Sequence, residues 1–257
     1  MPFRQVGDLR IFEFKSFSSE VLTHGIVTRN GGFSSSPWNS LNVGGGLGDS
    51  EKIVEKNIRR IFDALGRAIV SKYDVWQIHS ARFHVAELPY EQHRADILVT
   101  DNPELTLFMR YADCVPIMLY DPQAQAIALA HAGWRGIVEN VPAVAVQALT
   151  STYGSNPANI IAALGPAICK ECYPVGVEVV DQLKQALGSD TTHTIVRRNG
   201  NPHLDLWSLC EMLLHRAGVN SIESASICTA TNLDDWFSHR AEKGKTGRFA
   251  ALLGLVG

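Results

Sequence analysis

The stretch that most constrains the fold is residues 111–136, YADCVPIMLYDPQAQAIALAHAGWRG, in which two apolar runs flank Asp121-Pro122. Apolar runs on both sides of such a turn dipeptide predict a β-hairpin. If the hairpin is symmetric about the peptide bond after Pro122, Cys114 lies opposite His131, with β-carbons about 4.5 to 5.5 Å apart. That spacing suits a thiolate and an imidazole that share one metal ion or one proton, whereas a slip of one residue would send them to opposite faces.

This cysteine and histidine leave two interpretations open. The pair is either a cysteine nucleophile activated by a histidine or part of a metal site that still lacks ligands, and a third donor would decide for the metal. The segment Val75–Val85, VWQIHSARFHV, is typical of a strand and holds His79 in its middle. A histidine among apolar neighbours is more often a hydrogen-bonded core residue, and His84 and His24 are weaker candidates still.

The rest of the chain mixes strand and helix patterns. Strand-like runs at 21–29 and 95–99 alternate with helical periodicity over 51–65, 142–149 and 206–217. These elements interleave without the regular βαβ rhythm of a Rossmann sheet, so we expect an α/β chain of the α+β-like kind. With 257 residues, 46% of them hydrophobic, the chain can bury a substantial core, and we expect one domain over its whole length.

Charge and cysteine content narrow the function classes. A net charge of -3 gives no broad basic field for nucleic acid, and small-molecule chemistry is favoured.

The sequence also carries no sign of export or of a membrane span. The N-terminal MPFRQVGDLR lacks the apolar run of a signal peptide, and the most apolar segment is broken by an Asp-Pro pair before it could span a bilayer. We therefore expect a cytoplasmic protein without membrane contact. Five cysteines do not suggest a disulfide framework, and the C-x-x-C of Cys169 and Cys172 has no second C-x-x-C to complete a four-thiolate zinc site.

Nine motifs follow one another along nearly the whole chain: TRNGGFSSSPWNSLNVG (28–44), GD (48–49), WQIHS (76–80), ADILVT (95–100), YADCVPIMLYD (111–121), AHAGWRG (130–136), LGPAIC (164–169), LDL (204–206) and CTATNLDDWFSHRAEKGKTGR (228–248). In these motifs the sequence resembles the laccase-domain family, also called multicopper polyphenol oxidoreductases and peptidoglycan-editing factors. Members are described as zinc-dependent purine nucleoside phosphorylases and adenosine deaminases. The resemblance implies stacked mixed β-sheets flanked by helices.

The resemblance also implies a metal site. In the family the ion is held by the histidine of Q-x-H, the cysteine of ADC-x-P and the histidine of HAGWRG, which correspond here to His79, Cys114 and His131. One ion per chain is therefore expected, with one coordination position left open, as in catalytic zinc sites. Such an ion lowers the pKa of bound water or polarises a substrate group, which fits the deamination of adenosine.

Phosphorolysis needs an anion beside the ribose, and arginines bind anions well. Substrate-binding candidates in the motifs are Arg29, Asn42, Arg135, Arg240 and Arg248, and Asp113 is a candidate for handling protons or holding the substrate. For each arginine a structural salt bridge is an equally good explanation. Two departures put the binding of ribose or phosphate in doubt: the family's F-S-Y-R-R reads FSHRA at 237–241, and the tyrosine of its N-terminal motif is Trp38.

The sequence thus predicts a zinc-dependent purine nucleoside phosphorylase and adenosine deaminase acting on adenosine, inosine and methylthioadenosine, with phosphate as co-substrate. One alternative is a Cys114–His131 amide hydrolase that edits cell-wall precursors, with His79 as a bystander. Others are a single-copper polyphenol oxidase, using Cu²⁺ with Met109 or Met118 as axial ligand, and a non-enzymatic scaffold that stores metal. Nine scattered histidines without an H-x-H pair exclude multicopper chemistry, and the oligomeric state is left open.

Overall fold

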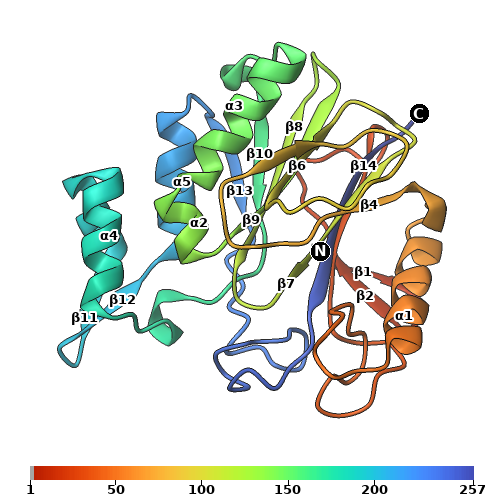
Figure 1. The fold of residues 1–257 in the computed structure, drawn as a ribbon, viewed down its shortest axis with the longest axis horizontal. Helices are drawn as coiled ribbons and strands as arrows, with labels where there is room; N and C mark the ends of the chain where they lie inside the picture. The colour runs from red at the N-terminus through yellow and green to blue at the C-terminus, as the bar shows by residue number, and fades with distance from the viewer. Residues whose placement is uncertain (1–2) are drawn as a thin grey trace.

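The computed structural model describes residues 3–257 and has a mixed α/β architecture with two six-stranded sheets (Figure 1). The first sheet has the order β1 (Phe3–Val6), β2 (Leu9–Phe12), β3 (Leu22–Val27), β14 (Phe249–Leu255), β7 (Thr106–Tyr111) and β4 (Lys72–Asp74). The second has the order β13 (Ser221–Ser224), β10 (Ile161–Leu164), β8 (Val115–Asp121), β9 (Ala126–Ala132), β6 (Ile97–Thr100) and β5 (Phe83–Val85). Both sheets are mixed, because β4–β7, β10–β13 and β5–β6 pair in parallel and the other neighbours are antiparallel.

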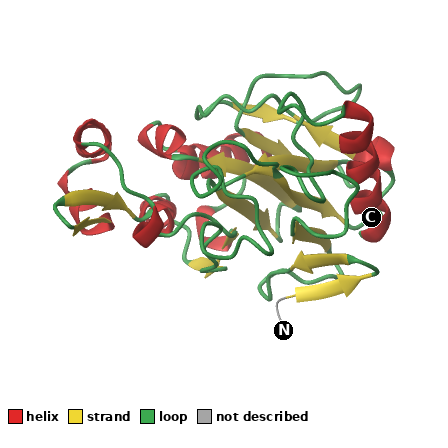
Figure 2. Cartoon of the chain, turned by 90° about the horizontal axis from the view of Figure 1, so that it is seen from below, coloured by secondary structure: helices red, strands yellow, loops and turns green. Residues whose placement is uncertain are grey.

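Helices flank the two sheets. They are α1 (Glu51–Ala64), α2 (Trp134–Val138), α3 (Val141–Tyr153), α4 (Val177–Leu187) and α5 (Leu206–Arg216). Helix α1 lies on one side, and α2, α3 and α5 lie on the other (Figure 1), while α4 and the small hairpin of β11 (Ile195–Arg198) and β12 (Asn201–Leu204) lie at one end (Figure 2). No helix within residues 3–257 is long and apolar enough to cross a membrane.

The core has three layers because the central strands bury both faces. In β9, Ile127 and Leu129 pack between the two sheets, whereas Ala128 and Ala130 pack toward α3 and α5. Strands buried on both sides appear as continuous apolar runs, as β8, β9 and β14 do. His131 lies two residues beyond Leu129 and four beyond Ile127 on the same strand. Its side chain therefore points, like theirs, to the layer between the sheets.

Several predicted elements are confirmed. The 51–65 periodicity forms α1, which buries Ile61 and Phe62 against the first sheet, and the 206–217 periodicity forms α5. Helix α3 runs beyond the predicted 142–149 to end where Gly154 adopts φ 70°. The strands predicted at 21–29 and 95–99 correspond to β3 and β6. The family's stacked mixed sheets are therefore present.

The predicted hairpin forms, but its predicted register is wrong by two residues. His131 pairs with Pro116 rather than Cys114. The cause is a longer turn, in which the carboxylate of Asp121 accepts the backbone N–H groups of Gln123 and Ala124 at 2.9 and 3.3 Å. Because strand side chains alternate with a period of two, this shift leaves Cys114 and His131 on the same face.

Candidate metal centre

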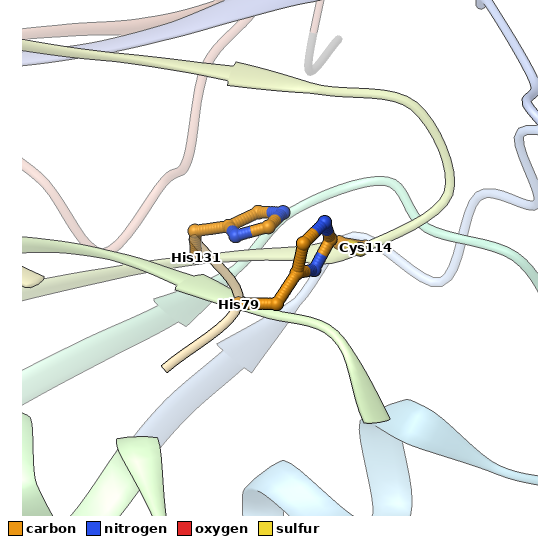
Figure 3. A group of neighbouring side chains, drawn as sticks. All are labelled: His79, Cys114 and His131. Carbon is orange, nitrogen blue, oxygen red and sulfur yellow. The ribbon is translucent and has the colours of Figure 1, made fainter. Parts of the chain in front are cut away.

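Three side chains from separate parts of the chain converge at one end of the layer between the sheets (Figure 3). His131 lies near the end of β9, Cys114 directly before β8, and His79 in the loop between β4 and β5. One nitrogen of each histidine and the cysteine sulfur all lie within 4.8 Å of one another. The structure therefore brings together the three residues that the sequence predicts as metal ligands.

His79 is not in the middle of a strand, as the sequence predicted, but in a turn with φ 60°. The carboxylate of Asp96 holds this turn, because it accepts the backbone N–H groups of Ile78, His79 and Ser80 at 3.1, 3.0 and 2.7 Å. The Ser80 hydroxyl donates to the same carboxylate at 2.9 Å. Three backbone N–H groups that could have bonded to a neighbouring strand thus donate to one buried carboxylate instead. The strand is interrupted for this reason.

Asp96 also orients the second histidine. His131 Nδ1 lies 2.9 Å from Asp96 Oδ1, so its ring presents Nε2 to the other donors. Burial would raise the pKa of Asp96, but the hydrogen bonds from His131 and the backbone of residues 78 and 80 hold it below its ordinary value. A carboxylate that fixes a ligating histidine is a regular part of metal sites. The sequence analysis missed this residue, although a charged side chain beside the apolar run ILV signals a partnered carboxylate.

Cys114 and His131 shift each other's pKa in opposite directions. Burial would raise the pKa of Cys114, but the charge and hydrogen bonds of His131 and His79 lower it to about 6. Burial would lower the pKa of His131, yet the Cys114 thiolate and Asp96 raise it to about 9. Near neutral pH the cysteine is therefore a thiolate, which is the form that binds metal or attacks as a nucleophile.

The site opens to solvent on one side. His131 is only 4% exposed, Cys114 is half-buried, and His79 is exposed. Two donors are thus fixed in the sheet and the third lies at the surface. A bound ion would keep its remaining coordination position toward solvent and substrate.

Gly133 supplies the space beside the donors. A β-carbon at this position would lie 2.9 Å from Cys114 Sγ and 3.2 Å from His79 Nδ1. Its φ of -86° is accessible to alanine, so the constraint is steric. We expect Gly133→Ala to fold but to bind metal about tenfold or more weakly, as measured by competition with a chromophoric chelator. Gly45→Ala is the matched control, since its β-carbon meets no atom within 4 Å; equal metal affinity in both variants would contradict the assignment.

These two pKa shifts also predict how metal affinity changes with pH. Between about pH 7 and pH 9 the free site holds a Cys114 thiolate and a protonated His131, and metal binding must remove that proton. Affinity should therefore rise about tenfold per pH unit in this window and level off once His131 is neutral. Chelator competition titrations across the window measure this slope, and a flat profile would show that His131 is neutral before metal binds.

Three of the predicted arginines, Arg135, Arg240 and Arg248, share charged neighbours with the donors. Burial raises the pKa of Tyr173, and the charges of Cys114 and Asp113 add to the increase while Arg240 and Arg135 oppose it. Arg240 also lies over the Tyr173 ring at 4.9 Å. The sequence analysis did not single out this tyrosine, which has no motif of its own beyond the pair Cys172-Tyr173.

Arg248 faces the same charges. Burial lowers its pKa, and Cys114 and Asp113 oppose the shift. Its backbone N–H donates to Asn42 Oδ1 at 2.8 Å, and the Asn42 amide donates to the Gly44 carbonyl and to Asp49. Asn42 is thus a fully bonded residue that positions the arginine.

Arg29 lies in a different environment. Its guanidinium donates to Asn39, Leu233 and Glu242 at 2.9, 3.1 and 3.1 Å and packs 4.2 Å from the Phe237 ring centre. These contacts use its donors to join loops. A structural role for Arg29 is therefore favoured over phosphate binding.

Asp113 is held by both of its carboxylate oxygens. Oδ1 accepts a hydrogen bond from the Thr229 hydroxyl at 2.6 Å, and Oδ2 accepts one from the backbone N–H of Arg240 at 2.7 Å. Its φ of 83° is rare for a residue with a side chain, and the Ile168 N–H bonds its carbonyl at 3.0 Å. This carboxylate therefore fixes the backbone that leads into Cys114.

The remaining histidine and methionine candidates have other partners. His24 Nε2 accepts the Phe14 N–H at 2.9 Å, and His84 Nε2 lies 2.8 Å from the Tyr73 hydroxyl. Met109 and Met118 are fully buried in the layer between the sheets. Neither histidine belongs to the group of converging donors among residues 3–257.

The chain is similar to known proteins along almost its whole length. Residues 23–256 match the family described as multi-copper polyphenol oxidoreductase laccase. A protein of Deinococcus radiodurans named purine nucleoside phosphorylase is 36% identical over 233 residues, covering 90% of this chain and 88% of that protein. Purine nucleoside phosphorylase YlmD of Bacillus subtilis is 32% identical, covering 90% and 87%. The crystal structure of hypothetical protein YfiH of Bacillus licheniformis matches with a TM-score of 0.92 at 33% identity, covering 99% of both chains.

Proposed function

This chain belongs to the multi-copper polyphenol oxidoreductase laccase family, and from that membership we propose that it is a metal-dependent purine nucleoside phosphorylase. The observation that carries the proposal is the grouping of His79, Cys114 and His131. The names of the relatives support the same substrate class. A cytoplasmic location, a single domain and the lack of nucleic-acid or membrane partners stay predictions.

The donor set fits one metal ion. Two imidazoles and a thiolate suit Zn²⁺, with Cu²⁺ as the alternative ion. Asp96 leaves His131 Nε2 free to bind, and Gly133 leaves space beside the Cys114 sulfur. When bound, the ion supplies a Lewis acid at an open coordination position.

In phosphorolysis a phosphate oxygen attacks the C1′ carbon of the ribose, and the bond from C1′ to the purine nitrogen breaks. The bonding electrons leave with the purine, which takes up a proton. We assign the binding of phosphate to Arg135, Arg240 and Arg248, whose guanidinium groups favour an anion at this end of the sheets. Asp113 holds Arg240 through its backbone, so we assign it a positioning role.

Deamination of adenosine is a second reaction for the same site. Water replaces the 6-amino group, ammonia leaves, and inosine forms without phosphate. We propose adenosine, inosine and methylthioadenosine as substrates of the phosphorylase, and adenosine as the substrate of the deaminase. The two reactions differ in their phosphate requirement, which makes them separable in one assay.

A Cys-His-Asp triad supports a second candidate function. Asp96 orients His131, and His131 lowers the pKa of the Cys114 thiol to about 6, as an amide hydrolase requires. In such a hydrolase of cell-wall precursors His79 would have no chemical role. The proximity of His79 to the pair favours the metal, so this hydrolase and the single-copper oxidase stay alternatives.

A phosphate-dependence assay with adenosine and inosine on metal-analysed protein tests the proposal. We expect purine and ribose 1-phosphate only when phosphate is present, and loss of turnover after chelation. Phosphate-independent formation of inosine from adenosine would assign the deaminase. Full activity on an amide after chelation would replace the proposal by the triad hydrolase, and no turnover at any metal loading would leave a metal-storing scaffold.

A further inference from the structure

Three cysteines outside the metal centre described above form a second cluster: Cys169, Cys172 and Cys228. Their sulfur atoms all lie within 4.8 Å of one another, and all three are free thiols. An ion with sulfur bonds of about 2.3 Å holds neighbouring sulfurs roughly 4 Å apart. The cluster is therefore compact enough for three thiolates to share one ion.

The backbone fixes this cluster from two directions. Cys169 and Cys172 lie on one short 3₁₀ turn, closed by the Cys172 N–H to the Cys169 carbonyl at 3.0 Å. Cys228 arrives on a distant segment that bridges Ala167, and the Thr229 N–H donates to the Ala167 carbonyl at 3.0 Å. A C-x-x-C turn with a further cysteine from another segment is a usual construction of a thiolate metal site.

One backbone donor already faces a sulfur. The Cys169 N–H donates to Cys228 Sγ at 3.2 Å, and such a bond stabilises the thiolate that binds metal. Cys169 and Cys172 are half-exposed, while Cys228 is buried. An ion can thus enter from solvent and meet one ligand that is already held from within the protein.

We propose that Cys169, Cys172 and Cys228 bind a second metal ion, a thiophilic d¹⁰ cation that is either Zn²⁺ or Cu⁺. On binding, three thiols release three protons to solvent and three metal–sulfur bonds form, with no change of oxidation state. This ion is additional to the single ion that the sequence predicts. The site shares no ligand with the first centre and does not depend on the proposed function.

The second ion would stabilise the backbone around the first centre. Cys169 follows Ile168, whose N–H bonds the Asp113 carbonyl, and Cys228 precedes Thr229, whose hydroxyl bonds the Asp113 carboxylate. An ion between the cysteines links these two segments covalently. We therefore assign it a structural role in fixing the backbone that enters the first centre.

Metal analysis of the untagged full chain, loaded with Zn²⁺ and freed of excess ion, tests the second site. We expect two ions per chain in the unmodified protein and one in Cys169→Ser/Cys172→Ser. We also expect one in His79→Ala/Cys114→Ser, and two in the control Cys210→Ala, which removes a core cysteine. A parallel series with Cu⁺ under reducing, oxygen-free conditions identifies the preferred ion, and retention of either ion at the cysteines supports the site.

Cobalt substitution provides a spectroscopic check. In His79→Ala/Cys114→Ser the remaining Co²⁺ should show strong sulfur-to-metal charge-transfer absorption, because all its protein ligands are thiolates. A protein that holds one ion, lost with His79 and Cys114 but not with Cys169 and Cys172, would overturn the proposal. Loss of two hydrogens in the protein mass, unaffected by chelator, would show a disulfide in place of the site.

Alkylation of the unmodified protein covers the case in which the cysteine variants do not fold. In the Zn²⁺-loaded protein we expect Cys169 and Cys172 to resist iodoacetamide and to react after chelation, as read by peptide mass spectrometry. Buried Cys210 should stay unreactive in both states and reports that the fold is intact. Equal labelling of Cys169 and Cys172 with and without chelator would also overturn the site.

Discussion

Replacing Cys114 by alanine is expected to remove one metal ion per chain and to abolish turnover of purine nucleosides. The thiolate is the only soft ligand of the first centre, and without it two imidazoles remain to hold the ion. The fold should survive, because Cys114 lies before β8, at the edge of the core between the sheets. Metal content, circular dichroism and the phosphate-dependent assay on the same preparation measure the three outcomes.

Cys210→Ala is the control for this result. Cys210 is fully buried on α5 and belongs to neither group of converging donors among residues 3–257, so its loss leaves a small cavity. We expect a decrease of about 1 to 2 kcal/mol in the free energy of unfolding, with metal content and turnover unchanged. If Cys114→Ala keeps its metal and activity while Cys210→Ala loses both, the ligand assignment and the function fail together.

Asp96→Asn is expected to have the second large effect, on both metal affinity and stability. One amide oxygen cannot replace two carboxylate oxygens that accept three backbone N–H groups, the Ser80 hydroxyl and His131. The amide NH₂ would face donors in a buried site, which costs roughly 2 to 5 kcal/mol of unfolding free energy. The loss of histidine orientation should weaken metal binding about 10- to 100-fold.

Asp121→Asn is the matched control, since Asp121 is also buried but lies at the turn of the β8–β9 hairpin. Within residues 3–257 its Oδ2 has no hydrogen-bond partner, so an amide nitrogen at that position breaks no hydrogen bond. We expect its metal affinity to equal that of the unmodified protein in chelator competition. If Asp96→Asn binds metal as tightly as the unmodified protein, the Asp96 carboxylate does not position His131. Denaturant unfolding curves measure the stability of the variant separately, so that a loss of affinity is not confused with unfolding.

Local patterns were enough to predict α1, α3, α5 and the hairpin, because their signals lie within short windows, whereas α2 and α4 were not predicted. The apolar positions of α1 and α5 repeat at helical spacing, and the Asp-Pro pair marks the turn between β8 and β9. The register failed because the Asp121 carboxylate extends the turn, which depends on a side-chain hydrogen bond that the apolar pattern does not encode. The shift was an even number of residues, so the predicted proximity of Cys114 and His131 was retained.

Contacts between distant segments could not be predicted in this way. His79 lies in a turn because Asp96, directly before β6, accepts its N–H and those of its neighbours, and nothing in the segment around His79 encodes that partner. Likewise, Cys228 meets the C-x-x-C turn through an isolated bridge to Ala167, which joins segments far apart in the sequence. The resemblance in sequence motifs identified the proposed ligands of the first centre. It did not single out the residues that hold those ligands in position.

The graded burial of the three donors has a kinetic consequence. The β8–β9 hairpin positions Cys114 and His131, whereas His79 lies in a turn at the surface. His79 is therefore the donor that an ion entering from solvent would meet at the surface. Because Asp96 holds the backbone of His79, we expect it to influence how long an ion stays bound, even though Asp96 is not itself a proposed ligand.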